Sequence, residues 1–255
     1  MSGSPTPAQT MLPTGQLGYI LPPRVGDAIQ HQFYHTCPPD LMLVVYPLNL
    51  GAFTETGIEE AIAQFRSAFD FLAARKVDRI VQAGIPVSSF AGRERILGFL
   101  EEAARRAPDI PASADIEESI EGFKLLGCRK IAIAGRWDDA LMGRVAAYLR
   151  AAGLEPLGWA AQIHTTQQVM DVRPRDGIDM ALALGRRAFQ ENPGADGLLL
   201  AGGLWLSNAA IPVLEEEFGR PVITNPAASY WAFMRQLGRS APRRGYGMLI
   251  DSLQP

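Results

Sequence analysis

The chain alternates short apolar runs with longer segments in which apolar residues recur every three or four positions. Continuous apolar runs are typical of strands buried on both faces of a sheet, and the helical spacing is typical of the helices that connect parallel strands. The runs predict strands at LGYIL (17–21), LMLVVYPL (41–48), RIVQAG (79–84), KIAIAG (130–135), GLLLAG (197–202) and RPVITN (220–225). The segments between them predict helices at 57–75, 93–106, 116–126, 139–152, 178–191, 208–218 and 228–237. The pattern therefore predicts an α/β fold.

An internal repeat indicates two similar halves. The segments ARKVDRIVQAG, LLGCRKIAIAG and NPGADGLLLAG each run from a helix end through a turn into a strand that ends in Ala-Gly. Two open sheets related by such a repeat would form two lobes with a cleft between their strand ends. Because ligands of open α/β sheets bind beyond the carboxyl ends of the strands, we expect the site at loops 84–92, 135–139 and 201–208.

Composition and charge narrow the classes of partner. The 255 residues include 24 Lys plus Arg and 27 Asp plus Glu, a formal net charge of −3, which argues against nucleic acid or an anionic membrane as a partner. No apolar run approaches the ~20 residues of a membrane-spanning helix. Residues 1–16 lack the basic start and apolar centre of a secretion signal, so we interpret them as a disordered leader. The spacing of Cys37 and Cys128 fits no disulfide framework and favours a cytoplasmic protein. Assembly into a homo-oligomer is left open.

Most cofactor motifs are missing from the chain. Neither GIPVSSFAG nor AGGLWLSNA supplies the Gly-x-Gly-x-x-Gly turn of a dinucleotide site, and no lysine follows a phosphate-binding glycine loop. His31 and His35 are four residues apart, but prolines follow at once and no carboxylate pair completes a metal site. Ser88 lacks the Gly-x-Ser-x-Gly spacing of a hydrolase nucleophile and better suits a hydrogen-bond donor at a helix N-terminus. We therefore expect no cofactor and no metal.

Two segments carry candidate chemistry. In PASADIEESIEG, Asp115 and Glu117 open a predicted helix, where acidic residues oppose the helix dipole favourably; alternatively, one of them faces the cleft and transfers protons with a raised pKa. In AGGLW, Gly202 and Gly203 could present amide hydrogens to a developing negative charge, or form no more than a tight turn.

Five segments together resemble one known superfamily. They are LGYILPP, AGIPVSSF, LGCRKIAIAGRWDD, the long run from DGLLLAGGLW to MRQLG, and GYGMLID, spread from about residue 17 to 251. They are similar to the aspartate/glutamate/hydantoin racemase superfamily, in its arylmalonate decarboxylase branch, with maleate isomerases nearby. The resemblance implies two Rossmann-like lobes with parallel sheets about a pseudo-twofold axis and a site at the interlobe cleft, without cofactor or metal. We expect 17–116 plus 220–255 to form lobe 1 and 117–219 to form lobe 2.

The chain departs from this family at its reactive positions. Family racemases place a cysteine after a strand in each lobe, and arylmalonate decarboxylase keeps the second; here these positions match Gly84 and Ala201. A hydroxyl pair that binds the leaving carboxylate is replaced by Ile85 and Pro86, and a site tyrosine by Trp137. Because neither glycine nor alanine can transfer a proton, another group must do so if the chain is an enzyme.

Relatives in this family hold a substrate carboxylate with a pair of Ser or Thr hydroxyls. This pair matches Ile116 and Glu117 here, so an acidic residue replaces a neutral hydroxyl. Our hypothesis is a cofactor-independent lyase, decarboxylase-like, that acts next to the carboxyl or carbonyl of a small organic acid through an enolate-like intermediate. Glu117 would transfer the proton, with Asp115 as a reserve. The substrate would contact Pro22, Gly84, Ile85, Ser88, Trp137, Ala201, Gly202 and Gly203. The alternatives are a cis-trans isomerase or racemase, a hydratase or hydrolase using a Glu-activated water, and a non-catalytic protein that binds small acids.

Overall fold

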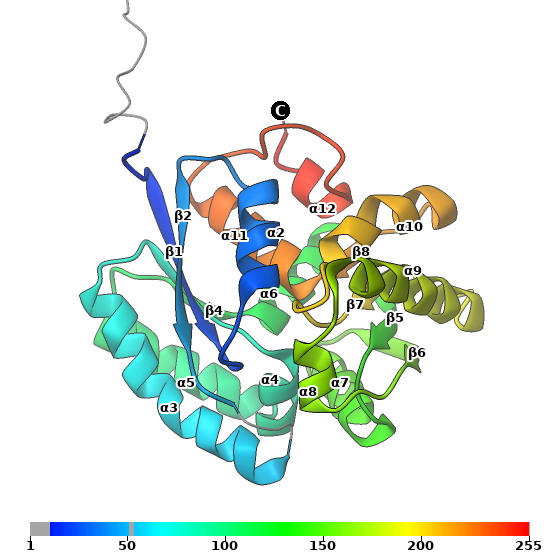
Figure 1. The fold of residues 1–255 in the computed structure, drawn as a ribbon, viewed down its shortest axis with the longest axis horizontal. Helices are drawn as coiled ribbons and strands as arrows, with labels where there is room; N and C mark the ends of the chain where they lie inside the picture. The colour runs from blue at the N-terminus through cyan, green and yellow to red at the C-terminus, as the bar shows by residue number, and fades with distance from the viewer. Residues whose placement is uncertain (1–10, 51–53, 255) are drawn as a thin grey trace, which may run out of the picture.

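The computed structural model describes residues 11–50 and 54–254, and Figure 1 shows their arrangement. The strands are β1 (Gly15–Leu21), β2 (Leu41–Pro47), β3 (Arg79–Gln82), β4 (Ala112–Ala114), β5 (Lys130–Gly135), β6 (Glu155–Ala161), β7 (Gly197–Leu200) and β8 (Val222–Thr224). The helices are α2 (Asp27–Thr36), α3 (Glu55–Ala74), α4 (Ile85–Ala91), α5 (Arg93–Arg106), α6 (Asp115–Leu125), α7 (Asp139–Ala151), α8 (Thr166–Met170), α9 (Pro174–Glu191), the 3₁₀ turn η1 (Ser207–Ala210), α10 (Ile211–Phe218), α11 (Asn225–Gln236) and α12 (Met248–Asp251). Of the expected leader, residues 1–10 lie outside the described residues, whereas Gly15 and Gln16 already belong to β1.

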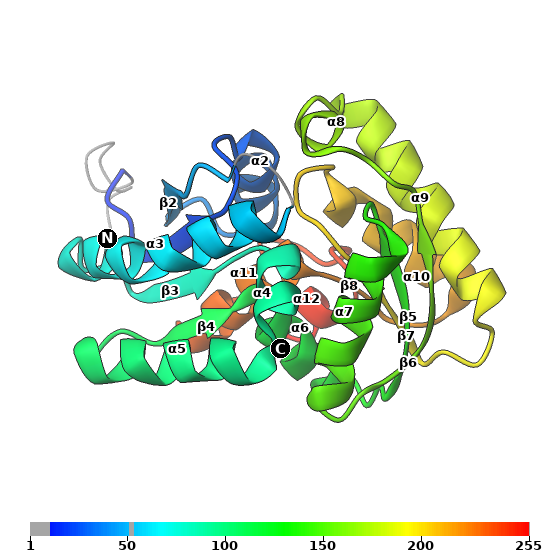
Figure 2. The ribbon, with the colours of Figure 1, turned by 90° about the horizontal axis from the view of Figure 1, so that it is seen from below.

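Two four-stranded parallel sheets form the frame, in the orders β2-β1-β3-β4 and β6-β5-β7-β8. When the strands are numbered within each sheet, both sheets have the same order, second-first-third-fourth. An approximate twofold axis between the two halves would produce this match. The two sheets occupy opposite halves of the molecule, with α4, α6 and α7 between them (Figure 2). The predicted α/β fold with parallel sheets is confirmed.

Helices pack on these sheets through the stripes that the sequence indicates. In α3, Ile58, Phe65, Phe69 and Leu72 are buried, at the spacing that places them on one helix face. The Thr54 hydroxyl caps this helix by accepting a hydrogen bond from the backbone N–H of Gly57. The buried stripe fixes α3 against the first sheet, with which it makes contacts at β1 and β3.

Residues 220–255 are assigned to lobe 1 from the sequence, and β8 lies within this range. Strand β8 pairs with β7 in the second sheet, so the second sheet extends to Thr224. The chain then returns to the first half, because α11 packs against α6 and α2. The crossing therefore occurs between β8 and α11, at Asn225.

Several elements differ from the sequence prediction, among them the unpredicted helices α2, α8 and α12. Strands β4 and β6 were not predicted because Ala-Ser-Ala and Glu-Pro-Leu-Gly-Trp-Ala-Ala lack a run of strongly β-forming residues, and both are edge strands. The predicted loop 84–92 is instead mostly α4, since Pro86 suits the first turn of a helix and Gly84 and Gly92 bound it with positive φ angles.

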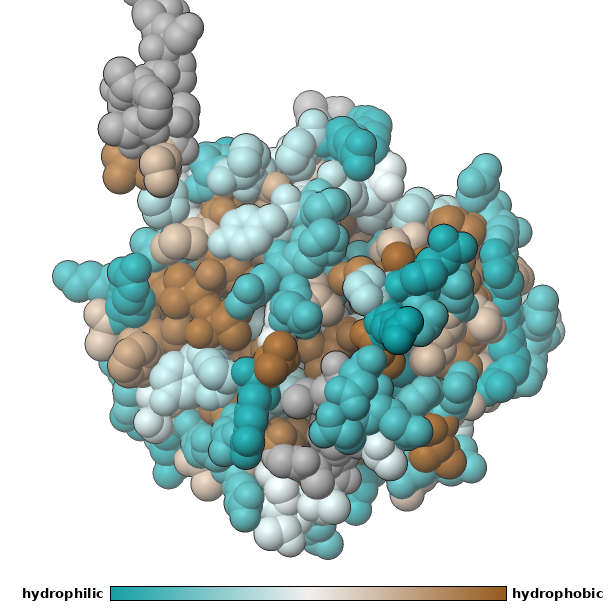
Figure 3. All heavy atoms as spheres, in the orientation of Figure 1, coloured by the Kyte–Doolittle hydropathy of each residue, from teal (hydrophilic) through white to brown (hydrophobic). Residues whose placement is uncertain are grey.

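The surface is mixed. Figure 3 shows polar side chains over most of one face, with apolar side chains gathered over the region of edge strand β2, where Val44 and Val45 are half-buried. Among the described residues, no helix is both long and apolar enough to cross a membrane.

Candidate functional site at the strand ends

Strands from both sheets end at one small pocket. It is lined by residues that follow β1, β3, β5, β7 and β8, together with parts of α2, α4 and α8, and has a volume of about 50 Å³. Its lining residues are Tyr19, Leu21, Pro22, Pro23, Ile29, Ala83, Gly84, Ile85, Pro86, Val87, Arg136, Trp137, Val169, Gly202, Gly203, Leu204 and Asn225. All three loops expected to form the site contribute to this lining. Most of the lining is apolar, as in many small-molecule sites.

Six of the substrate-contact residues expected from the sequence line this pocket, namely Pro22, Gly84, Ile85, Trp137, Gly202 and Gly203. Two do not. Ser88 is completely buried within α4, and its hydroxyl donates a hydrogen bond to Gln82 Oε1 at 2.9 Å. Ala201 is completely buried and is not among the lining residues. Ser88 and Ala201 therefore lie outside the residues that line the pocket.

The repeat identifies Gly202 as the counterpart of Gly84. Each is the second residue after the third strand of its sheet, with φ angles of +105° at Gly84 and +112° at Gly202. Glycine adopts positive φ angles readily, whereas other residues do so at a cost in energy. The backbone conformation therefore explains why both turns have glycine at this position. The position that corresponds to Gly84 in the second half is thus Gly202 and not Ala201.

A hydrogen-bonded bridge joins these two turns. The Gly84 N–H donates to Asp115 Oδ2 at 2.8 Å, and the Gly202 N–H donates to Asn225 Oδ1 at 2.9 Å. Asp115 follows β4 and Asn225 follows β8, so each half uses the residue after its fourth strand to hold its own glycine turn. Asn225 Nδ2 also donates to Asp115 Oδ2 at 2.7 Å, which connects the two halves.

Asp115 is the carboxylate of its helix that contacts the glycine turn. It is completely buried, and its Oδ1 atom has no hydrogen-bond partner among the described residues. Burial raises its pKa to about 7, although the hydrogen bonds from Gly84 and Asn225 act in the opposite direction. Asp115 accepts hydrogen bonds from two lining residues, Gly84 and Asn225, but does not line the pocket itself. Its role is therefore to position these two lining residues.

Glu117, which the sequence suggested as the proton-transfer group, faces elsewhere. Both of its carboxylate oxygens accept hydrogen bonds from Arg93, at 2.8 and 3.0 Å. Its neighbours in the helix are paired in the same way, Glu118 with Arg79 and Glu121 with Arg235. These pairs show why the sequence could not distinguish the four acidic residues, since the distinction depends on arginines from distant elements. The structure therefore places Glu117 outside the residues that line the strand-end pocket.

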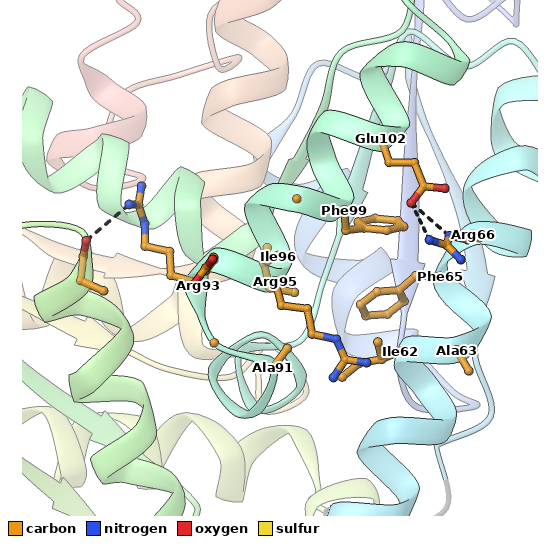
Figure 4. A pocket seen from close by; sticks show the side chains of 14 residues that line it. Ile62, Ala63, Phe65, Arg66, Ala91, Arg93, Arg95, Ile96, Phe99 and Glu102 are labelled. Atoms are coloured by element: carbon orange, nitrogen blue, oxygen red, sulfur yellow. Dashed lines mark hydrogen bonds and ion pairs between the residues drawn. The ribbon is translucent and has the colours of Figure 1, made fainter.

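Arg93 itself lines a different hollow, a surface groove of about 920 Å³ between α3, α5 and the end of α7 (Figure 4). The three arginines of this groove are already paired with carboxylates: Arg66 with Glu102, Arg93 with Glu117 and Arg95 with Glu59. Because the groove lies on helix surfaces and its arginines are neutralised, it is a poorer candidate than the strand-end pocket.

Besides Asn225, two polar lining residues were not identified from the sequence. Tyr19 lies on β1 and is completely buried; burial, and then the negative charge of Asp115, raise the pKa of its hydroxyl. Arg136 directly follows β5, is 3% exposed, and has its guanidinium 4.7 Å from the centroid of the Trp205 ring. The rule that ligands bind beyond strand ends pointed to the loop that contains Arg136, but burial without a partner is visible only in the structure.

Comparisons with known proteins agree with this frame. A family model described as arylmalonate decarboxylase matches residues 17–250. The arylmalonate decarboxylase of Bordetella bronchiseptica is 30% identical over 242 residues, 93% of this chain and 97% of that protein.

Solved structures give the same result. A liganded double mutant of arylmalonate decarboxylase is 27% identical with a TM-score of 0.83, covering 94% of this chain and 100% of that one. Unliganded arylmalonate decarboxylase is 26% identical with a TM-score of 0.76, covering 94% of this chain and 100% of that one. The maleate isomerase Iso from Pseudomonas putida S16 shares the fold, with a TM-score of 0.81 at 16% identity over 94% of this chain and 99% of that one. The chain therefore belongs to the arylmalonate decarboxylase family.

Proposed function

We propose that the chain is a cofactor-independent carbon–carbon lyase that removes carbon dioxide from a small organic acid bound in the strand-end pocket. The observation that carries this proposal is that five strand ends from both sheets meet at one pocket with mostly apolar lining. A carboxylate in apolar surroundings loses the solvation that stabilises its charge, and loss of neutral carbon dioxide relieves that cost. Family membership supports the same reaction class.

Tyr19 is our candidate for the proton donor. Tyr19 and Arg136 are the titratable side chains among the described lining residues, and we assign the proton to Tyr19 because the Arg136 guanidinium is the only cation among them and is needed to hold the negative charge of the ligand. In the proposed reaction, the bond to the leaving carboxylate breaks, its electrons form an enolate, and the hydroxyl of Tyr19 then protonates the carbon. Asp115, whose charge acts on Tyr19, is the group that would return a proton to the tyrosinate.

Replacement of Tyr19 by Phe tests this assignment. The variant removes the hydroxyl and keeps the ring, and we expect turnover to fall by at least about 100-fold, the lower end of what a general acid contributes. Carbon dioxide release from phenylmalonate and methylmalonate, followed in deuterated water, is the measurement. The Glu117→Gln variant, with its carboxylate already paired to Arg93, should lose little turnover. Full activity of Tyr19→Phe would remove Tyr19 from the mechanism.

A specific observation favours a second function, the binding of a small acid without catalysis. No Cys, His, Asp or Glu side chain is present among the described residues that line the pocket. The same assay separates the possibilities: deuterium exchange without carbon dioxide would support an isomerase or racemase, and ligand stabilisation without either would support a binding protein. The hydratase or hydrolase alternative gains no support from Glu117, because its carboxylate is paired with Arg93 and does not line the pocket.

A further inference from the structure

Arg136 is a buried cation for which the described residues supply no anion. Its side chain makes no ion pair with any of them, and its Nη1 atom is buried without a hydrogen-bond partner. Other arginines with low exposure are neutralised, as Arg79 is by Glu118 and Arg93 by Glu117. Burial lowers the pKa of Arg136 to about 10, with no nearby carboxylate to offset it, so the group is still charged at neutral pH.

The guanidinium is also held in place at the pocket. It stacks on the Trp205 ring, and the Trp205 indole N–H in turn donates to the carbonyl of Gly202, which follows β7. A stacked guanidinium keeps the N–H groups at its edge available for an acceptor in its plane. A carboxylate matches this fork with two parallel hydrogen bonds. The polar edge of Arg136 thus lacks a partner, whereas its face is occupied.

We infer that Arg136 is the binding group for the carboxylate that a small organic acid retains through the reaction, with the rest of the ligand on the apolar lining. Its description as a substrate contact rests on the proposed function; its description as an anion site does not. Arg136 is the only cationic side chain among the described lining residues. A malonate-type acid would therefore have one carboxylate on Arg136 and one without a cation, and the second is the one that leaves.

Equilibrium binding to an unreactive pair of compounds tests the anion site. Phenylacetate carries a single carboxylate, and phenylacetamide is its neutral counterpart of similar shape. We expect phenylacetate affinity, measured by calorimetry, to fall by about 10- to 100-fold in Arg136→Gln, the range for charge-assisted hydrogen bonds. Phenylacetamide affinity should change by less than about 3-fold. Arg144→Gln is the matched control, because Arg144 also stacks on an aromatic ring, that of Phe90 at 4.5 Å, but is exposed.

Two results of this experiment would overturn the inference. One is unchanged phenylacetate affinity in Arg136→Gln. The other is failure of the wild-type protein to bind phenylacetate, malonate or phenylmalonate at about 10 mM, a concentration that reveals even weak sites.

Thermal unfolding without ligand gives an independent measurement. An unpaired buried charge destabilises a fold, and replacing it by an apolar side chain of similar length removes that cost. We expect Arg136→Met to unfold at least about 2 °C above the wild type. A marked decrease in melting temperature would instead assign Arg136 a structural role and overturn the inference.

The outcomes also separate this inference from the proposed reaction. If the wild type binds carboxylates through Arg136 but releases no carbon dioxide from any acid, the lyase proposal fails and the anion site stands. If the wild type releases carbon dioxide and Arg136→Gln does so with the same KM and kcat, the lyase stands and the inference fails.

Discussion

Asp115 and Asn225 occupy equivalent positions in the two halves, but Asp115 has a carboxylate where Asn225 has an amide. Each accepts a hydrogen bond from the glycine turn of its own half, and the amide of Asn225 supplies the donor that joins them. Two carboxylates at these positions would repel one another or share a proton. The acid–amide pair forms the bridge while leaving a single titrating group at its centre.

This titrating group predicts a pH dependence of stability. The pKa of Asp115 is about 7 in the folded protein and near 3.8 when unfolded, so between these values the folded state holds the extra proton. The contribution of Asp115 to the free energy of unfolding therefore decreases as pH rises from about 4 to about 7.

Asp115→Asn keeps an acceptor for Gly84 and Asn225 and removes the charge. We expect the variant to gain stability relative to the wild type on going from about pH 4 to pH 8, by on the order of a few kcal/mol. Denaturant midpoints of both proteins at the two pH values measure this change in relative stability. The titration of groups that both proteins share cancels in the comparison. An equal difference at the two pH values would contradict the prediction.

At the scale of elements, the turn after β7 depends on the close approach of α9. A Cβ atom at Gly177 would lie 2.6 Å from the backbone carbonyl oxygen of Trp205, a distance that real Cβ atoms do not tolerate. Helix α9 can therefore support the turn that carries Trp205 only with glycine at this point.

Two glycine-to-alanine variants in helices test this contact. Gly177→Ala should destabilise the protein by about 1–3 kcal/mol, because backbone must move to relieve the overlap. Gly143→Ala, in α7 with open space around the added methyl, should stabilise it by roughly 0.5–1 kcal/mol. Chemical denaturation measures both, and equal effects would show that the approach of α9 is unimportant.

The elements also show how far the sequence leads. Buried strands such as β1 and β5 were predictable because their apolar runs report burial on both faces, whereas β4 has only Ala-Ser-Ala to signal it. In the site, the strand-end rule located the right loops, and the resemblance found Gly84 and Trp137. The inward turn of Asp115 and the missing partner of Arg136 depend on which distant residues meet, which no local pattern records.

At the scale of the whole molecule, the strand-end pocket is small, with a volume of about 50 Å³. Pockets that hold drug-sized ligands typically have volumes of about 300–1,000 Å³. We therefore predict that the turns of the two halves separate when an aromatic acid enters.

Hydrogen exchange tests this opening. We expect saturating phenylacetate, which has no carboxylate to lose as carbon dioxide by this reaction, to slow amide exchange at the turns that follow β3 and β7 together, because the Asp115–Asn225 bridge couples them. Mass spectrometry of peptides that cover residues 83–92 and 201–210 provides the measurement. Slowing confined to one half would contradict coupled opening.

The matching strand order has a consequence for stereochemistry. Pro22 directly follows the first strand of one sheet and Arg136 directly follows the first strand of the other, so a near-symmetric frame carries its cation on one side only. A prochiral diacid whose two carboxyl groups are chemically identical would find them in unlike surroundings. Handedness of the product would then depend on the side of the pocket that carries Arg136.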